Sequence, residues 1–486
     1  MKKVYILLAV LLQAAIAFAE GGYTTSGNGT TYTFASLSGI EGSGVTKVAD
    51  KTYNVATDLT IEGADKLKIE SGDIVKLADG VLVTVTGEAI FNPENRATVT
   101  VDGEAKPVGF TLKGKAEMRN LDVTGGNFYY QGNDALVVDN CNFRNINGNR
   151  SNYGVIVLAG YSKGSQVTNC TFTDCEPGAV NTPANLGVGL LIENNTMTNC
   201  STLDKLCPYI NVTSSATDEV VIRNNTLNGA RLEKPGGIGV SNMLNAAGDN
   251  KVLIEGNKVE NCSWGINLVG GMDVRLVNNL VKDNNADSDV NGGIAVTMYS
   301  LAQLPQTVYA TGNTFQGNKW GPIAMGATTV NFGNLSATGD DYNPGMNIFI
   351  GNGHEDNGAY VACDFCNYNT GADAYAQGNV WNNATTEEEV AATIFDNNYD
   401  SSKYGKVIYS PFRTTGVESI NSDSNCTIDG GVITLDAPAM ITVYNMAGVA
   451  VASAYTDALD TANLPAGIYA VRIDNGNGVK TAKFAK

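Results

Sequence analysis

The 486-residue chain has little of the side chains most used in catalysis and metal binding. It contains one histidine, His354, three tryptophans, and 31 lysines and arginines against 49 aspartates and glutamates. A site that pairs histidine with serine or cysteine could therefore involve only His354, and we expect that residue to lie on the surface in its polar loop. The net charge of −18 opposes binding to nucleic acid, anionic membranes and polyanionic glycans.

Long hydrophobic runs are also missing. No segment approaches the roughly 20 apolar residues that a transmembrane helix requires. The first 19 residues begin with Lys2 and Lys3, continue with apolar residues from Val4 to Leu12, and end in Ala17-Phe18-Ala19. This pattern is typical of a secretory signal peptide with an A-x-A cleavage site. We therefore predict an exported chain without a transmembrane segment.

One short phrase, apolar-x-[Asn or Gly]-[Asn or Cys]-x-apolar, recurs nine times between residues 139 and 380. Asn or Gly at the first turn position tolerates a left-handed backbone, so each phrase predicts a strand, a sharp bend and a second strand. Recurrence every 22 to 39 residues indicates a solenoid whose stacked turn asparagines form a hydrogen-bonded ladder. The second turn residues are Cys141, Cys170, Asn195, Asn225, Asn257, Asn279, Asn313, Asn352 and Asn379.

A third strand lies between consecutive bends, as in YINVTS, GIGVSNM, GINLVGG and GIAVTMY. Three strands per coil predict a three-sheet right-handed parallel β-helix. Over about residues 50 to 412 the sequence resembles the parallel β-helix repeat proteins of the pectate-lyase-like superfamily. We expect a segment at 20–51, then the β-helix at 52–412 with N-terminal capping coils and a C-terminal cap at about 385–412 that starts with a short helix.

Five of the nine cysteines recur at two fixed positions of the repeat: Cys141, Cys170, Cys175, Cys200 and Cys262. Repeated placement predicts small buried side chains stacked along the solenoid, with one or two bridges between adjacent coils as the alternative. Cys363 and Cys366 lack the second ligand pair of a zinc site, which leaves a local disulfide or two free thiols.

Residues 417–486 change to short alternating strands that suit a small Ig-like β-sandwich. The run from Ile441 to Gly448, LPAGIY at 464–469 and the terminal KTAKFAK resemble the type IX secretion C-terminal sorting domain. That resemblance implies export by the type IX secretion machinery across the outer membrane of a Gram-negative bacterium, followed by surface attachment or release. The fold class expected is all-β, a parallel β-helix followed by a small sandwich.

Relatives of the β-helix fold include polysaccharide lyases and glycosidases, whose ionisable groups project from the third-strand sheet. Here the alternation predicts an outer face without ionisable residues, with Asn211, Thr213, Gly239, Ser241, Asn267, Val269, Ala295, Thr297, Ala324 and Gly326 pointing outward. The apolar partners Ile294, Val296, Ile323 and Met325 are expected to point inward in the last two of these strands.

Aromatic residues offer a binding hint on the same sheet. Trp264 and Trp320 each precede a third strand, and Tyr209 and Tyr299 lie on or beside it. With Asn211 and Asn267 they would suit the stacking of a neutral sugar. Packing of the rings against the coil beneath is the alternative, because aromatic side chains bury large areas wherever they lie.

The loop at 283–293 brings Asp283, Asp287 and Asp289 close together in sequence, so calcium is a possible ligand, although no cofactor is required. Solvated loop carboxylates are the alternative. Arg223 recurs at one outward position with two glutamates of neighbouring coils and is expected to pair with them across the sheet: Glu193 and Glu255.

The preferred interpretation is a monomeric exported β-helix protein that engages an extracellular polysaccharide without cleaving it. One alternative is a polysaccharide lyase or glycoside hydrolase that uses loop residues, namely Asp283, Asp287, Asp289, Lys282 and Lys319. The other alternative is a structural or adhesive surface rod.

Overall fold

The structure is a computed structural model that describes residues 22–147, 154–160, 163–183, 187, 189–203, 207–243, 247–300, 304–326, 328–413, 426–429, 431–445, 450–465, 468–474 and 479–485. The expected signal peptide lies outside these residues. The described residues form two compact units, one from the ranges 22–379 and 386–412 and one from the ranges 380–385 and 413–485.

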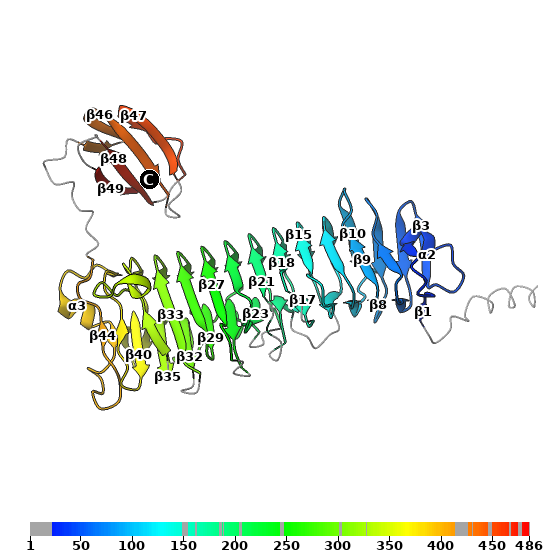
Figure 1. The fold of residues 1–486 in the computed structure, drawn as a ribbon, viewed down its shortest axis with the longest axis horizontal. Coiled ribbons are helices and arrows are strands. Elements are labelled where there is room, and N and C mark those ends of the chain that lie inside the picture. The colour runs from blue at the N-terminus through cyan, green and yellow to red at the C-terminus, as the bar shows by residue number, and fades with distance from the viewer. Residues whose placement is uncertain are drawn as a thin grey trace, which may run out of the picture. The chain divides into compact units, whose positions relative to one another are not determined.

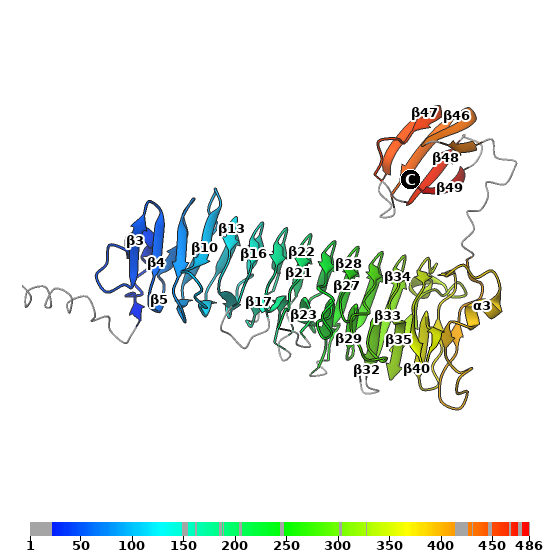
Figure 2. The same cartoon turned by 180° about the vertical axis from the view of Figure 1, so that it is seen from behind.

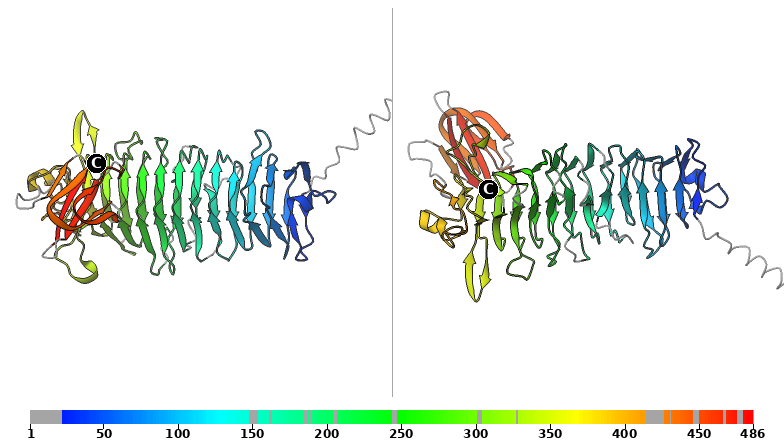
Figure 3. Two further views of the ribbon diagram at one scale, coloured as in Figure 1. Left: turned by 90° about the horizontal axis from the view of Figure 1, so that it is seen from above. Right: turned by 60° about the horizontal axis from the view of Figure 1, so that its bottom comes forward.

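Three sheets of fourteen strands each wind through the described part of the chain, and successive coils stack along one axis (Figures 1 and 3). Sheet A consists of β1 (Tyr23–Thr24), β5 (Leu59–Ile61), β8 (Leu82–Val85), β11 (Gly109–Leu112), β14 (Asn127–Tyr130), β17 (Gly154–Leu158), β20 (Gly178–Asn181), β23 (Ile210–Thr213), β26 (Ile238–Ser241), β29 (Ile266–Val269), β32 (Ile294–Ser300), β35 (Trp320–Gly326), β40 (Phe365–Asn369) and β43 (Ile394–Phe395).

Sheet B consists of the strands that precede the bends, namely β2 (Thr31–Thr33), β6 (Lys66–Lys68), β9 (Glu88–Phe91), β12 (Ala116–Arg119), β15 (Val137–Asp139), β18 (Ser165–Thr168), β21 (Leu190–Glu193), β24 (Val220–Arg223), β27 (Lys251–Glu255), β30 (Asp273–Val277), β33 (Gln306–Thr311), β36 (Thr328–Asn331), β41 (Ala374–Tyr375) and β44 (Val407–Ile408).

Sheet C consists of the strands that follow the bends, namely β3 (Val45–Ala49), β4 (Thr52–Val55), β7 (Ile74–Leu77), β10 (Ala97–Val101), β13 (Leu121–Val123), β16 (Asn142–Arg144), β19 (Thr171–Thr173), β22 (Thr196–Thr198), β25 (Thr226–Asn228), β28 (Lys258–Glu260), β31 (Leu280–Lys282), β34 (Thr314–Gln316), β37 (Ile348–Ile350) and β42 (Val380–Trp381). The parallel strands and the three-sheet coil confirm the expected β-helix.

The bend between sheets B and C works as the repeated phrase predicts. Asn169, Asn194 and Asn224 adopt φ of 55°, 57° and 55°, and Gly256 takes the same left-handed conformation at 63°. Residues before and after each bend point inward and pack on the same residue types in the next coil. Phe143 stacks on Phe172 with ring centroids 4.8 Å apart.

The second turn residues form a continuous buried ladder. Asn225 Oδ1 accepts from the backbone N–H and the Nδ2 of Asn195, and Asn257 Oδ1 accepts from the same two groups of Asn225. Equivalent bonds continue through later coils to Asn347 and Asn379. Each side chain satisfies the backbone of the neighbouring turn, which no solvent reaches.

A second ladder is formed by residues that follow those of the first ladder by five positions in the sequence. Cys262 N–H donates to Asn284 Oδ1, and the chain of bonds continues through Asn318 and Asn352 to Asp364. The placement of Asn352 in the first ladder is therefore wrong. Asn347 fills that position behind Met346, whose φ of 64° breaks the Asn-or-Gly rule by which the phrase was found.

The N-terminal end is closed by the segment that precedes residue 52. Strands β1 and β2 extend sheets A and B by one coil, and the short helix α2 (Phe34–Leu37) buries Phe34 and Leu37. Strand β3 pairs antiparallel with β4 and ends sheet C. The carboxylate of Asp65 accepts from the backbone N–H groups of Gly27 and Thr30 and fixes the loop between β1 and β2.

At the other end, helix α3 (Glu387–Ala391) begins with a capping box between Thr386 and Glu389, as the threonine and the three glutamates predict. A hairpin of β38 (Gly353–Asp356) and β39 (Ala359–Ala362) stands out from the coils beside it (Figure 3).

The C-terminal unit contains one antiparallel sheet of five described strands, β45 (Cys426–Asp429), β46 (Val432–Tyr444), β47 (Ala450–Asp460), β48 (Ile468–Asp474) and β49 (Val479–Ala485). Its core consists of Ile433, Ala439, Ile441, Val443, Tyr469, Val471 and Ile473. Figure 2 labels four of these strands, β46 to β49. Across the described residues of both units, no helix is long and apolar enough to cross a membrane.

Candidate functional site

The outer face of sheet A is polar in the middle coils. Asn211 Nδ2 donates to Asn181 Oδ1 at 2.7 Å, so these two side chains form a pair along the sheet. Asn267 lies in register with Thr297 of the next strand, and both are half-buried. As predicted, these positions carry no ionisable group, and Asn211, Asn267 and Thr297 supply amide and hydroxyl groups to the face here.

The character of the face changes at β35. Pairing places Pro322 opposite Val296 and Ile323 opposite Thr297, so Ile323 and Met325 point outward. The prediction that both point inward is wrong, because Pro322 and Ala324 take the inward positions of β35 and the apolar Ile323 and Met325 fall on the outward ones. Ile323 forms a buried cluster with Cys363 and Cys366, which we call the outer cluster. Ile294, also expected inward, packs against it, while Ala324, expected outward, is buried.

The outward rows continue into the C-terminal cap. Cys366 pairs with Ile323 on one side and with Phe395 on the other, and Tyr368 pairs with Met325. The described lining of the resulting open groove, which has a volume of about 560 Å³, is Trp320, Met325, Tyr368, Phe395, Tyr399, Lys403 and Tyr404. We call this surface the aromatic groove.

The rings of the aromatic groove contact one another in pairs. Tyr368 and Tyr404 lie edge to face with centroids 5.1 Å apart, and Phe395 and Tyr399 lie 5.2 Å apart. Tyr399 remains 73% exposed. Burial raises the pKa of Tyr368, so its hydroxyl stays protonated at physiological pH. The groove therefore combines apolar ring faces with phenolic hydroxyl donors.

The ring of Trp320 is held by the acidic loop. Trp320 Nε1 donates to the carbonyl oxygen of Val290 at 2.7 Å. Lys319 Nζ donates to the carbonyl oxygens of Asp287 and Asp289, the latter at 2.9 Å. A lysine ammonium thus already occupies the centre of this loop.

Calcium binding by Asp283, Asp287 and Asp289 is not supported. The carboxylate of Asp289 accepts from Asn291, that of Asp287 from the backbone N–H of Asp289, and that of Asp283 lies 3.6 Å from Lys282 Nζ. Among the residues that the structure describes, no group of three or more His, Cys, Asp or Glu side chains could hold a metal ion.

His354 lies on the other side of Trp320. Its ring is 4.4 Å from the Trp320 ring between centroids, and its Nδ1 is 3.3 Å from the carbonyl oxygen of Lys319. At 8% exposure it is buried, so the prediction of a surface histidine is wrong. It lines a second hollow of about 420 Å³ with Asn285, Ser288, Val290, Lys319, Gly353, Glu355 and Tyr360.

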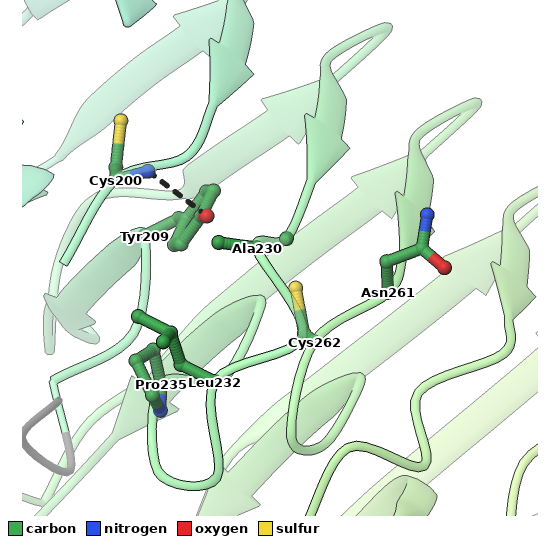
Figure 4. Close-up of a pocket in the computed structure, with 8 residues that line it drawn as sticks. Cys200, Tyr209, Ala230, Leu232, Pro235, Asn261 and Cys262 are labelled. Carbon is green, nitrogen blue, oxygen red and sulfur yellow. Dashed lines mark hydrogen bonds between the residues drawn. The ribbon is translucent and has the colours of Figure 1, made fainter. Parts of the chain in front are cut away.

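Tyr209 does not belong to the outer face. It is 1% exposed, and its hydroxyl accepts from the backbone N–H of Cys200 at 2.9 Å. Figure 4 shows the ring between Cys200 and Cys262 in a small enclosed space within the coils. The hypothesis that Tyr209 stacks on a sugar is therefore wrong, because burial removes it from any ligand.

The other aromatic candidates lie apart from one another. Tyr299 is 37% exposed and pairs with Met325 at the border of the aromatic groove. Trp264 packs over Gly236 of the preceding coil, where an added Cβ would come within 2.0 Å of the indole. Trp264 therefore covers a glycine several strands from the groove. This agrees with the alternative interpretation, in which the ring packs against the coil beneath it.

Reasoning from sequence missed Tyr368, Phe395, Tyr399 and Tyr404. In β40 the inward positions carry Asn367 and Asn369, both fully buried, which inverts the usual alternation of polar and apolar residues. The amide of Asn369 donates to the carbonyl oxygen of Thr328. The alternation in FCNYN, combined with the register of β35, was the only signal available for Tyr368.

Other groups that could serve catalysis are engaged elsewhere. Arg223 Nε lies 2.6 Å from Glu193 Oε1 and pairs in register with Glu255, as expected for a structural ladder. The eight cysteines whose side chains are described are buried. Burial raises the pKa of Cys262 to about 12, so this thiol stays uncharged.

Two family profiles match the chain. Residues 95–324 match "Periplasmic copper-binding protein (NosD)", and residues 424–486 match "Secretion system C-terminal sorting domain". The chain is a right-handed parallel β-helix protein with a C-terminal secretion sorting domain. The sorting domain indicates export by type IX secretion. No curated protein and no solved structure matches the chain.

Copper appears in the printed description of the first family, whose profile covers less than half of this β-helix protein. The described residues do not fit a copper site: they form no metal-binding cluster, and the single histidine packs against Trp320. The buried cysteines lie along the core with thiols that burial keeps protonated, such as Cys262.

Proposed function

We propose that this exported β-helix protein binds a neutral extracellular polysaccharide in the aromatic groove and does not cleave it. The observation that carries the proposal is the gathering of five aromatic rings around an open groove of about 560 Å³. That volume lies within the range of about 300–1,000 Å³ that is usual for ligand sites. Aromatic faces pack on the apolar C–H faces of sugar rings, and the phenolic hydroxyls of Tyr368 and Tyr404 bond to sugar hydroxyls.

The charge of the groove favours a neutral ligand. Its described lining contains one cation, Lys403, whose Nζ lies 4.7 Å from the centre of the Tyr404 ring. The chain as a whole carries a net charge of −18, which repels polyanions. A polysaccharide of uronic acids would lack the cluster of basic side chains that neutralises its carboxylates.

Binding without cleavage is supported by the absence of an acid–base pair. No carboxylate is among the described residues that line the aromatic groove, and a glycosidase needs two. Lys319, Asp287 and Asp289, three of the five residues of the enzyme alternative, are bonded to one another within the loop that holds Trp320. The sorting domain, which indicates export, supports binding at the cell surface or outside the cell.

The test compares two tryptophan variants on immobilised neutral polysaccharides, using the purified full chain. Trp320→Ala removes a ring of the aromatic groove, whereas Trp264→Ala removes a half-buried ring of the same sheet outside it. Loss of an aromatic anchor costs about 2 kcal/mol or more, so retention should weaken by roughly 30-fold in Trp320→Ala. Trp264→Ala should bind like the unmodified protein.

Product release is measured in the same incubations. Reducing-end or unsaturated products from the unmodified protein would refute binding without cleavage. Failure of the unmodified protein to be retained on any polysaccharide would favour the structural rod. Equal weakening by both tryptophan variants would place binding outside the aromatic groove.

A further inference from the structure

Two cysteines lie beneath the aromatic groove. Cys363 and Cys366 are fully buried, and their Sγ atoms are 2.8 Å apart. They form a cluster with Ile323, against which Trp320, Met325, Tyr368 and Phe395 pack. The two sulfur atoms therefore lie at the floor of the surface proposed to bind glycan.

The separation is close to that of a bonded pair. A disulfide bond is about 2.05 Å long, so the sulfur atoms need to approach by only about 0.8 Å. The backbone already holds both residues in place: Cys363 N–H donates to the carbonyl oxygen of Asn352, and Gly321 N–H donates to that of Cys363. Cys366 lies in β40, where it pairs with Ile323 of the neighbouring strand β35.

The surroundings do not suit a reactive dithiol. Redox-active cysteine pairs keep one thiol exposed and its pKa low. Here burial and the neighbouring Cys363 raise the pKa of Cys366, and neither sulfur reaches solvent. A cystine would be uncharged and apolar and would suit the contacts with Trp320 and Phe395.

The chain is exported, and exported proteins fold under oxidising conditions. We propose that Cys363 and Cys366 form a structural disulfide that fixes the floor of the aromatic groove. The disulfide of a thiol–disulfide carrier protein supplies the oxidation. Before folding buries the pair, one cysteine thiolate attacks the S–S bond of the carrier, which forms a mixed disulfide and releases one carrier thiolate. The second cysteine thiolate then displaces the other carrier sulfur. The carrier leaves as a dithiol with the two electrons and two protons.

The bridge acts locally. It closes a loop of four residues, so it restricts the unfolded chain far less than a long-range disulfide would. Its effect falls on the outward row Ile323, Cys366, Phe395 and on Tyr368, which is two residues from the bond. The effect on glycan retention rests on the proposed function, whereas the bond itself does not.

The first test is peptide mapping of the full-length exported protein. The chain has no Lys or Arg between Lys319 and Lys403, so trypsin releases residues 320–403 with these two cysteines and no others. After denaturation and alkylation without reductant, this peptide should carry no alkyl group and weigh two hydrogens less than the dithiol. After reduction it should carry two alkyl groups. Peptides with Cys141 and Cys170 should be alkylated without reductant, as an internal control for free thiols.

Alkylation of both Cys363 and Cys366 without reductant would overturn the disulfide. The second test compares Cys363→Ala/Cys366→Ala with unmodified protein under mild reductant, so that failure of the variant to fold cannot hide the answer. Retention on polysaccharide should fall several-fold, relative to the unmodified protein without reductant, both in the double variant and in the reduced unmodified protein. A mapped disulfide whose loss leaves retention unchanged would overturn its role in the groove. Absence of retention in the unmodified protein would refute the proposed function and leave the mapped disulfide standing.

Discussion

Replacement of Asn257 by alanine tests the buried asparagine ladder on which the β-helix depends. Asn257 Oδ1 accepts from the backbone N–H and Nδ2 of Asn225 at 3.0 and 2.9 Å. Its Nδ2 donates to the carbonyl oxygen of Ile222 and to Asn279 Oδ1 at 2.8 and 3.0 Å. All four bonds are lost in Asn257→Ala.

The magnitude follows from the groups left without partners. The two Asn225 donors lose their acceptor in a place that water does not reach, and each unsatisfied buried group costs about 1–3 kcal/mol. We therefore expect Asn257→Ala to lower the free energy of unfolding by about 2–6 kcal/mol. The matched control is Asn398→Ala, an exposed asparagine of the cap whose backbone N–H bond to Asp396 survives the change.

Tryptophan fluorescence in a denaturant titration measures the effect. The chain has three tryptophans, Trp264, Trp320 and Trp381, and all three lie in or beside strands of the β-helix sheets. The signal therefore reports unfolding of the coils, with no tryptophan in the sorting domain. If the free energy of unfolding of Asn257→Ala lies within about 0.5 kcal/mol of that of the control, the ladder does not stabilise the β-helix as argued.

Two further variants test the core and the N-terminal coils. Tyr209→Phe removes the hydroxyl that accepts from the buried Cys200 N–H, so we expect the β-helix to be destabilised by about 1–3 kcal/mol, measured as a lower unfolding midpoint. Polysaccharide retention should stay unchanged. A loss of retention in the folded variant would show that Tyr209 does contribute to the binding site. Hydrogen bonding from Lys66 lowers the pKa of Glu88 from its ordinary value of 4.5, so the charged form stabilises the fold above that value, and this contribution is lost as the pH falls through the lowered pKa. Glu88→Gln should therefore be less stable than the unmodified protein by under about 1 kcal/mol at neutral pH and equally stable in strong acid, whereas a difference that persists in acid would contradict the ion pair.

The coils were predictable because one local rule is repeated in each of them. A bend with φ near 55° favours Asn or Gly, and the alternation in the strands on both sides shows which residues face the core. The rule failed once, at Met346, where a residue outside the Asn-or-Gly pair adopts the left-handed conformation. A neighbouring phrase around Asn352 was then taken in its place, although Asn352 bonds within the second ladder.

The candidate site was less predictable, because its position depends on tertiary partners. Nothing in the local sequence shows that the hydroxyl of Tyr209 meets a buried N–H, or that Lys319 fills the loop assigned to calcium. The buried side-chain NH₂ groups of Asn367 and Asn369 each donate to a carbonyl oxygen about 40 residues away in sequence, and that of Asn367 also donates to one on a nearby loop. Alternation alone assigns such polar residues to the outer face, and Tyr368 to the inner one.

The alternation of β35, which puts Pro322 and Ala324 on the inward positions, is both the reason for that failure and the origin of the groove. It turns Ile323 and Met325 outward, where their exposure to water would cost about 25 cal/mol for each Å². The cap covers Ile323 to 5% exposure with the outer cluster, yet Met325 remains half-buried in the groove wall. The coils before β35 present amide and hydroxyl groups on this face, whereas the outward apolar residues of β35 require aromatic cover. The aromatic groove therefore arises where apolar residues replace polar ones on the outward positions of sheet A.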